Sequence, residues 1–248
     1  MSRTTGPVRW LQAFLDVPSE LFAETTAFWA AVTGATPVAP WPEHPQFRAL
    51  APPTGTRYLH VQSHDGASRV HLDLTSPDIE GDAGRLIDLG ARPIRRDRWW
   101  QVLNSPGGLP FCLVAETPGR LRPDPVRWPG GHRSRVAQLT VDVPATGYEA
   151  ECRFWQSATG WSERVGRRPE YRWLLPPTSS PMQLLLHRLD EATGPTRAHL
   201  DIGTDDVPAE TRRVRELGAT PRPEQPGDDW TVLTDPADLP FCVTPQPP

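Results

Sequence analysis

The chain has 248 residues, of which 37% are hydrophobic and 23% are charged, so it is long enough to bury one large core or two of common size. Its net charge of −4 and its pI near 6.0 leave no average excess of basic charge. This balance excludes the electrostatic footprint of proteins that bind nucleic acids or anionic membranes, and we expect neither partner.

The N-terminal segment, residues 1–17, lacks the long apolar core of a signal peptide. No apolar run approaches the roughly 20 residues that span a bilayer. The three cysteines, Cys112, Cys152 and Cys242, are too few and too far apart for a disulfide framework or a paired-cysteine zinc site, which fits a reducing compartment. We therefore expect a cytoplasmic protein.

The first predicted element is a strand over residues 10–17, in which polar and aromatic side chains alternate with apolar ones. Residues 19–34 have apolar side chains at helical spacing, and they predict a helix with Ser19 as the N-cap and Gly34 as the terminator. Segments 47–53 and 57–62 then have the pattern of strands.

A second unit of the same kind follows in the chain. The stretch 70–74 predicts a strand, and residues 78–89 predict a helix that is ended by Gly90. Strands are expected over 99–104 and 110–114. The order is therefore strand, helix and strands, twice over.

The whole pattern recurs in the second half of the chain, where opening and helical segments match at an offset of 126 residues. The clearest matches are QAFLDVP (12–18) with QLTVDVP (138–144), FWAAVTG (28–34) with FWQSATG (154–160), RVHLDLTS (69–76) with RAHLDIGT (197–204), and WQVLNSPGGLPFC (100–112) with WTVLTDPADLPFC (230–242). Because each copy exceeds a hundred residues, we expect tandem domains rather than short solenoid units.

Residues 115–134 carry proline, glycine and arginine without apolar periodicity, so we predict a linker that Trp128 pins to a domain surface. The predicted domains are then residues 1–114 and 135–248.

This organisation resembles the vicinal oxygen chelate superfamily, which includes glyoxalase I, extradiol dioxygenases, and the fosfomycin and bleomycin resistance proteins. The similarity lies in the closing motif S/D-P-x-x-L-P-F-C at 105–112 and 235–242, and in the opening pattern DVP…FW…TG. It implies an α+β fold of tandem glyoxalase-like domains, each with two βαβββ modules that form a curved mixed-sheet cup with helices outside. Four modules complete both cups within one chain, so we expect a monomer or a homodimer.

The resemblance also implies positions for metal ligands on the opening and closing strands of the modules. In the first domain these positions are Gln12, His60, His71 and Cys112; in the second they are Gln138, Leu184 or Leu185, His199 and Cys242. Cysteine stands where the family has glutamate, and the second domain has leucine at one position. We therefore expect one divalent metal at most, Fe, Mn, Ni or Zn, in the first domain, and a metal-free second domain.

Strand alternation supports a polar cup interior without reference to the family. Gln12, Asp16, His71, Asp73 and Cys112 are all out of phase with the apolar residues that must face the helices. Such an interior is suited to an ion or to a small polar molecule. Each histidine can instead be a structural residue bonded to its neighbours, and each cysteine a small hydrophobe rather than a thiolate ligand.

Further candidates follow from the same strands. Asp16 and Asp73 are the candidate catalytic residues, as proton carriers or as partners that orient a histidine, and the candidate substrate contacts are Phe14, Asp73 and Asp201. The matched tryptophans Trp29, Trp155, Trp100 and Trp230 are expected to be buried, whereas the unmatched Trp41, Trp161 and Trp173 are candidates for the rim of a ligand pocket.

Two functions stay open. One is a glyoxalase-like, metal-dependent isomerase, lyase or dioxygenase whose small-molecule substrate has vicinal oxygens. The alternative is a metal-free protein of the bleomycin-resistance type that binds and sequesters a small molecule, and the missing glutamates favour this alternative.

Overall fold

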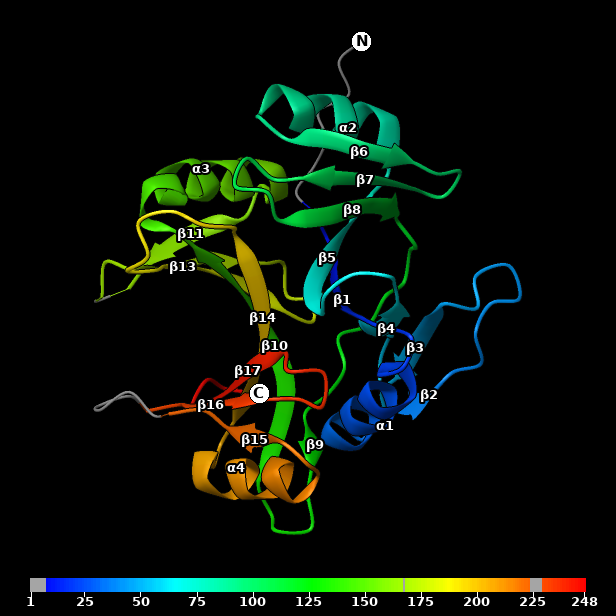
Figure 1. Ribbon diagram of the computed structural model, residues 1–248, viewed down its shortest axis with the longest axis vertical. Coiled ribbons are helices and arrows are strands. Elements are labelled where there is room, and N and C mark those ends of the chain that lie inside the picture. Colours follow the sequence, from blue (N-terminus) through cyan, green and yellow to red (C-terminus); the bar gives the residue numbers. More distant parts are fainter. Residues whose placement is uncertain (1–7, 167, 224–228) are drawn as a thin grey trace. The chain divides into compact units, whose positions relative to one another are not determined.

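Each half of the chain folds into two βαβββ modules in a computed structural model that describes residues 8–166, 168–223 and 229–248 (Figure 1). Residues 1–7, the start of the N-terminal segment, lie outside the described part. In the first half the elements are β1 (Leu11–Val17), α1 (Phe22–Thr33), β2 (Thr36–Pro37), β3 (Phe47–Ala51), β4 (Leu59–Ser63), β5 (Arg69–Ser76), α2 (Ile79–Asp88), β6 (Arg92–Arg96), β7 (Trp100–Asn104) and β8 (Pro110–Ala115).

The second half repeats this order after a short strand, β9 (Val126–Arg127). Its elements are β10 (Arg133–Val143), α3 (Tyr148–Thr159), β11 (Ser162–Val165), β12 (Tyr171–Leu175), β13 (Gln183–Arg188), β14 (Arg197–Thr204), α4 (Val207–Glu216), β15 (Thr220–Pro221), β16 (Thr231–Thr234) and β17 (Pro240–Thr244). A short 3-10 turn, Ala145–Gly147, precedes α3.

The strands form two open mixed sheets. The first has the order β2-β3-β4-β1-β5-β8-β7-β6, and the second has the order β11-β12-β13-β10-β14-β17-β16-β15, with β9 beside β10. The pairs β1–β4, β5–β8 and β14–β17 are parallel, whereas the hairpins within each module are antiparallel. The predicted α+β fold of four βαβββ modules is confirmed.

The helix ends follow from local chemistry. Gly34 and Gly90 have φ angles of 64° and 106°, which suits glycine and ends α1 and α2 as predicted. Asp78 caps α2 by accepting a hydrogen bond from the Gly81 amide at 3.1 Å. The predicted N-cap of α1 is wrong, because the helix begins after Leu21 and the Ser19 hydroxyl donates to the Glu20 carboxylate at 3.3 Å instead.

In the first half, two strands, β2 and β6, are absent from the sequence-based prediction. The first has only two residues, and the second is fully exposed and rich in arginine, so neither shows the alternation that marks a half-buried strand. Arginine and proline on an edge strand such as β6 discourage pairing with another chain.

The described chain divides into two compact units, each of which joins one module from each half. Unit 1 contains the described residues up to Gln12, together with His71–Arg120 and Thr140–Ala198. Unit 2 contains Ala13–Val70, Leu121–Leu139 and the described residues of His199–Pro248. The predicted boundaries at 114 and 135 stay a prediction.

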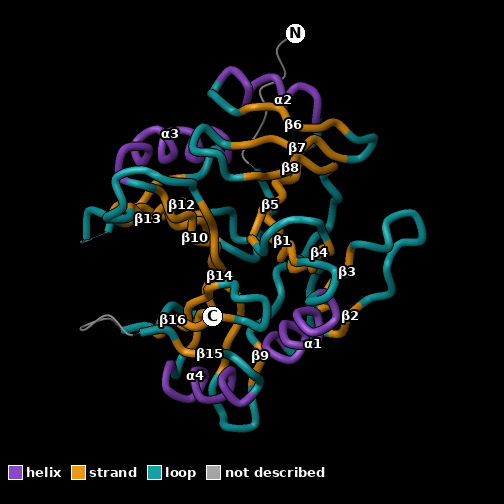
Figure 2. Tube along the Cα trace, in the orientation of Figure 1, coloured by secondary structure: helices purple, strands orange, loops and turns teal. Residues whose placement is uncertain are grey.

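The cores of the two units use the same aromatic packing. In unit 1, α2 packs on β7 and β8 and α3 packs on β13 (Figure 2). The Trp155 ring meets the Phe111 ring edge-on, with ring centres 5.1 Å apart. In unit 2, α1 packs on β3 and β4 and α4 packs on β17, and Trp29 meets Phe241 at 5.3 Å. Trp29 and Trp155 are buried as predicted.

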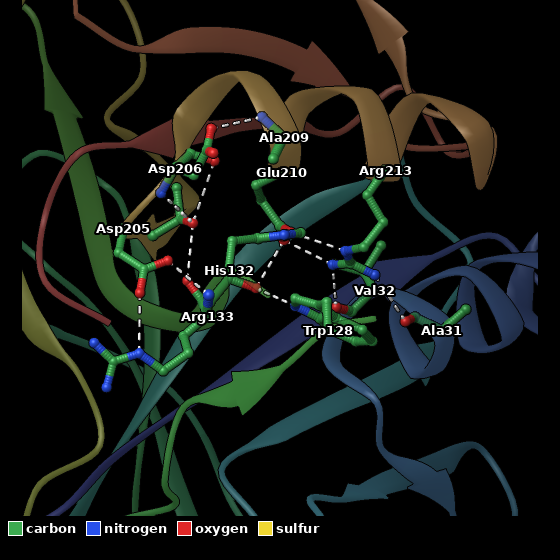
Figure 3. Close-up of polar contacts among 12 residues, drawn as sticks. Ala31, Val32, Trp128, His132, Arg133, Asp205, Asp206, Ala209, Glu210 and Arg213 are labelled. Atoms are coloured by element: carbon green, nitrogen blue, oxygen red, sulfur yellow. Dashed lines mark hydrogen bonds and ion pairs between the residues drawn. The ribbon is translucent and has the colours of Figure 1, made fainter. Parts of the chain in front are cut away.

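The segment between the two halves, residues 115–134, contacts the folded chain through β9 and Trp128. Strand β9 pairs with the start of β10, and the indole Nε1 of Trp128 donates to the Ser134 hydroxyl at 2.8 Å. The Arg213 guanidinium of α4 lies 3.5 Å from the centre of the Trp128 ring (Figure 3). Trp128 therefore pins the segment to α4, as the sequence suggested. Among the described residues, no helix has the length and apolarity needed to cross a membrane.

Candidate functional site

Strands β5 and β8 bring three potential metal ligands together in unit 1. Residues two apart on a strand share a face, so His71 and Asp73 point the same way. The parallel register places Cys112 opposite Asp73. One ligand atom from each of the three side chains lies within 4.8 Å of the other two.

The carboxylate of Asp73 is the centre of this group. His71 and Asp73 are only 7% and 4% exposed, and His71 Nε2 lies 3.5 Å from Asp73 Oδ1. Within the described part of the chain, that oxygen is buried and has no hydrogen bond. A buried carboxylate oxygen without a hydrogen bond is costly, and a bound cation would satisfy it.

The other oxygen of Asp73 is held by a short relay. Gln12 Nε2 donates to Asp73 Oδ2 at 3.1 Å, and Arg120 donates to Gln12 Oε1 at 3.2 Å. The Arg120 guanidinium also lies 5.3 Å from the centre of the Trp10 ring. Gln12 therefore orients Asp73 in this arrangement, and its predicted role as a direct ligand stays a prediction.

The electrostatics of the group keep the thiol protonated in the absence of a cation. Burial, together with the negative charge of Asp73, raises the pKa of Cys112 to about 11, and the hydrogen bond with His71 opposes this shift only in part. A metal ion at this position would have to displace the thiol proton, since the thiolate is the form that ligates.

The second half assembles the same residue types in unit 2. His199 Nε2 lies 3.2 Å from Asp201 Oδ1 and 3.5 Å from Cys242 Sγ, and Gln138 donates to Asp201 Oδ2. Asp201 stands opposite Cys242 in the parallel pair β14–β17. Both halves therefore present a histidine, an aspartate and a cysteine that can hold a metal, and the expected absence of metal from the second half stays a prediction.

These donor sets fit a divalent transition metal. Imidazole nitrogen, carboxylate oxygen and thiolate sulfur are the ligand types found around zinc, usually in tetrahedral geometry with one position open at catalytic sites. A thiolate disfavours Mn²⁺, which prefers oxygen donors. The residues therefore fit zinc or iron better than manganese.

Several other predicted site residues lie in unit 2. His60 on β4 stacks on Phe14 of β1, with ring centres 4.5 Å apart and planes 11° apart. Asp16 on β1 is buried and accepts a hydrogen bond from Arg69 at 2.8 Å. The group around Cys112 thus contains His71 and Asp73, while the proposed roles of His60, Phe14 and Asp16 stay predictions.

The aromatic predictions need two corrections. Trp161 is buried rather than at a rim, because its indole Nε1 donates to the Val8 carbonyl at 2.7 Å. Trp100 and Trp230 are half-buried rather than buried: Trp100 is the first residue of β7, and Trp230 lies in the bend just before β16. Trp41 is exposed and Trp173 is half-buried.

Sequence reasoning missed Arg120 and the pair Asp142–His187. Arg120 sits in the segment predicted as a linker, and only the folded chain brings it to Gln12. His187 lies two residues after the leucine position on β13, and its Nδ1 is 2.8 Å from Asp142 Oδ1. The alternation of polar residues on β10 is the one signal that could have indicated Asp142.

The profile of the family described as glyoxalase-like domain matches residues 12–114 and again residues 138–244. The chain belongs to the glyoxalase-like domain family. The two matches span the two halves of the repeat, and the resemblance to the vicinal oxygen chelate superfamily is confirmed. No curated protein matches the sequence.

Solved structures share the fold of this glyoxalase-like chain at low sequence identity. An Mn(II)-bound glyoxalase from Novosphingobium aromaticivorans has a TM-score of 0.69 at 14% identity, with 96% of this chain and 82% of that chain covered. A variant of homoprotocatechuate 2,3-dioxygenase from B. fuscum has a TM-score of 0.65 at 14% identity, with 98% and 72% covered. For 2,2',3-trihydroxybiphenyl 1,2-dioxygenase from Sphingomonas wittichii strain RW1 the values are 0.60, 12%, 96% and 90%. These similarities establish the fold and leave the reaction open.

Proposed function

We propose that the protein is a metal-dependent enzyme that acts on a small molecule with two neighbouring oxygen atoms, as an isomerase, lyase or dioxygenase. The observation that carries the proposal is the group of buried His71, buried Asp73 and half-buried Cys112, in which Asp73 Oδ1 has no hydrogen bond within the described chain. The glyoxalase and dioxygenases that share the fold support the same class of chemistry.

Each residue of the group has a distinct part in this proposal. His71 Nε2, Asp73 Oδ1 and Cys112 Sγ would hold the ion, and Gln12 with Arg120 would keep Asp73 in the orientation that presents Oδ1. When bound, a divalent ion supplies a Lewis acid that polarises the oxygens of the substrate. The Cys112 thiol gives up its proton on binding, so metal affinity should rise with pH.

The remaining candidates keep their roles as part of the proposal. If Asp73 is a ligand, Asp16 is left as the proton carrier, although its ion pair with Arg69 would have to open first. Phe14 would contact the substrate through its ring, and Asp201 would act in the second half as Asp73 does in the first.

Metal stoichiometry and spectroscopy test the proposal without a known substrate. Protein purified without chelator is analysed for Zn, Fe, Mn and Ni, and chelated protein is titrated with Co²⁺, whose thiolate complexes have a charge-transfer absorption band. We expect a stoichiometric ion and a thiolate band that Cys112→Ser and His71→Ala abolish in a His199→Ala background. Absence of binding by the wild-type chain, or a band that survives Cys112→Ser and Cys242→Ser together, would contradict the metal centre.

A second candidate, a metal-free binding protein, is favoured by two observations. The raised pKa of Cys112 keeps the thiol neutral, and the relay from Arg120 through Gln12 to Asp73 is complete without an ion. Turnover of dicarbonyl or catechol substrates that is abolished by chelator and by His71→Ala would exclude this candidate. Tryptophan quenching by aromatic ligands in chelator, without turnover in any metal, would favour it over the enzyme.

A further inference from the structure

The strand register of unit 1 continues the row of proposed metal ligands to an arginine at the edge of the sheet. Asp73 on β5 lies opposite Cys112 on β8, and Cys112 lies opposite Val102 on β7. Val102 in turn lies opposite Arg95 on β6, and strands β8, β7 and β6 lie side by side in this order (Figure 1). Residues opposite each other on neighbouring strands project from the same face of a sheet. Arg95 therefore shares a face with Asp73 and Cys112.

A β-bulge brings Arg95 into this row. The register of β6 and β7 shifts between Pro93 and Arg95, so that Ile94 is the extra residue. Gln101 is buried beside the bulge, and its Nε2 donates to the Arg95 carbonyl at 3.0 Å. Without the bulge, Ile94 would lie opposite Val102 and Arg95 would project from the other face. The bulge thus directs the arginine to the face of the proposed metal ligands.

The second half reaches the same arrangement in unit 2 without a bulge. Asp201 on β14 lies opposite Cys242 on β17, and Cys242 lies opposite Val232 on β16. Beyond the last paired residue of β15, Pro221, the register continues with a hydrogen bond of 2.9 Å from the Arg222 amide to the Val232 carbonyl. An aspartate, a cysteine, a valine and an arginine therefore form one row in each half.

The two rows are built from different sequences. Arg222 follows Pro221 directly, whereas Ile94 separates Arg95 from Pro93. An extra residue in a strand turns every later side chain to the opposite face unless a bulge absorbs it. Here the bulge absorbs it, so an arginine ends the row in both halves despite the difference in length.

The row has the chemistry to bind an elongated anionic molecule. Neighbouring strands are about 4.8 Å apart, so the row from Cys112 to Arg95 spans about 10 Å. Between them lies the half-buried, apolar Val102, whereas Arg95 is exposed. A planar guanidinium matches the two oxygens of a carboxylate. A ligand with its neighbouring oxygens beside Asp73 and Cys112 would extend an apolar part over Val102 and bring its far end to Arg95.

We propose that Arg95 selects substrates that carry a carboxylate at the end remote from the two neighbouring oxygens, and that Arg222 does the same in the second half. This inference rests on the proposed function, and it adds the substrate class: amphipathic carboxylates with an apolar middle. The guanidinium binds the carboxylate and takes no part in the chemistry at the metal. Neutral compounds of the same shape bind more weakly.

Two catechols of the same shape test the proposal, 3-(3,4-dihydroxyphenyl)propionate and the corresponding neutral propanamide. Each is titrated by isothermal calorimetry into Zn²⁺-loaded protein in a His199→Ala background, which leaves the first site. We expect the propionate to bind about 5-fold more tightly, the effect of a well-formed exposed ion pair. Arg95→Met should reduce this preference below about 2-fold. Arg95→Gln repeats the test if Arg95→Met no longer binds Zn²⁺.

The next residue on β6 provides the matched control. Arg96 lies opposite Gln101 and therefore projects from the other face of the sheet. Arg96→Met should keep the preference for the propionate, and its Zn²⁺ affinity should equal that of Arg95→Met. In a His71→Ala background, which leaves the second site, Arg222→Met should remove the preference in the same way.

The outcomes separate this inference from the function on which it rests. Failure of the protein to bind Zn²⁺ overturns both. If Zn²⁺ binds, the inference alone is overturned when neither catechol binds, when the propionate has no advantage, or when the advantage survives both Arg95 variants. Equal loss of the advantage in Arg96→Met also overturns it, because the general charge of β6 would then decide the preference.

Discussion

In each unit a buried tryptophan donates its indole N–H to a carboxylate. The carboxylate comes from a helix in one unit and from a loop in the other. In unit 1, Trp155 Nε1 donates to Glu151 Oε2 at 2.7 Å, and Glu151 lies one turn earlier on the same helix. The other oxygen of Glu151 accepts from the Gly107 amide in the loop between β7 and β8. Two residues before Gly107, the same loop has Ser105, whose side chain carries no charge.

Unit 2 reverses the arrangement. Trp29 Nε1 donates at 2.8 Å to Asp235, which lies in the loop between β16 and β17. Its other oxygen accepts from the Ala237 and Leu239 amides at 2.8 and 2.9 Å. The helix position that corresponds to Glu151 is Thr25, a buried residue whose hydroxyl has no hydrogen bond in the described chain.

One carboxylate thus accepts from the matched tryptophan of each unit, and it is supplied by the helix in one case and by the loop in the other. Burial raises the pKa of both Glu151 and Asp235, so a second carboxylate at either place would be costly. The difference shows that the buried indole N–H needs a hydrogen-bond acceptor here, and that either the helix or the loop can supply it.

The largest expected effect comes from Asp235→Ala. It leaves the Trp29 indole and two backbone amides without their acceptor, and each buried unsatisfied group costs about 1–3 kcal/mol, so we expect a loss of about 4 kcal/mol in the free energy of unfolding. Urea denaturation measures it. The double variant Thr25→Glu/Asp235→Ser, which copies unit 1, should recover more than half of the loss. A double variant no more stable than Asp235→Ser alone would show that the two arrangements are not interchangeable.

A second comparison concerns the arginines that bind the ends of helices. Arg213 donates to the carbonyls of Ala31 and Val32 at the end of α1, and Arg85 donates to those of Ser157 and Ala158 at the end of α3. Arg213 also pairs with the buried Glu210, which His132 contacts as well (Figure 3). The Ser134 hydroxyl donates to the same carboxylate.

Removal of these arginines should have unequal effects. Arg213→Met leaves a buried carboxylate without its cation and should cost about 3 kcal/mol of unfolding free energy. The Arg85 side chain is 33% exposed against 15% for Arg213, so Arg85→Met should cost about 1 kcal/mol. Thermal and urea unfolding of both variants provide the measurement, and equal losses would contradict this difference between the units.

The relay at the proposed metal centre of unit 1 gives a third test. Arg120 holds Gln12 in unit 1 by donating to Oε1 at 3.2 Å. In a His199→Ala background, which leaves the first site, Arg120→Met should weaken Zn²⁺ binding about 10-fold by isothermal titration. Arg96→Met on the exposed strand β6 is the control. Unchanged affinity in Arg120→Met would remove Arg120 from the site.

The smallest expected effect concerns the free energy of unfolding, to which Glu151 and Glu210 should contribute with opposite dependences on pH. The folded pKa of Glu151 lies above its ordinary value of 4.5, so its carboxylate lowers stability as the pH rises from 4.5 through the folded pKa. Burial also favours neutral Glu210, but the bonds and charge of Arg213, with His132 and Ser134, outweigh burial and lower its pKa. Its stabilisation is present above 4.5 and lost as the pH falls through the folded pKa.

Urea unfolding between about pH 4 and pH 7 should therefore show differences of opposite slope. Relative to Glu151→Gln, the wild type should lose stability as the pH rises, and relative to Glu210→Gln it should gain stability. Slopes of the same sign would mean that one of the two carboxyl groups is not in the environment that these contacts create.

The sequence by itself determined the elements that depend on neighbours along the chain. The repeat predicted four modules, Gly34 and Gly90 indicated the helix ends, and the spacing of two residues on β5 placed His71 and Asp73 on one face. These features follow from local periodicity and from the backbone freedom of glycine, and both can be recognised from residues that are close together in the sequence.

Only the tertiary structure decided which distant residues meet. Cys112 stands opposite Asp73 because of the parallel register of β5 and β8, and a shift of one residue would have turned it to the other face. Arg120 reaches Gln12 across 108 positions of sequence, and His187 reaches Asp142 across 45. Such pairings depend on how strands align in the folded sheet, and no periodicity within a single segment carries that information.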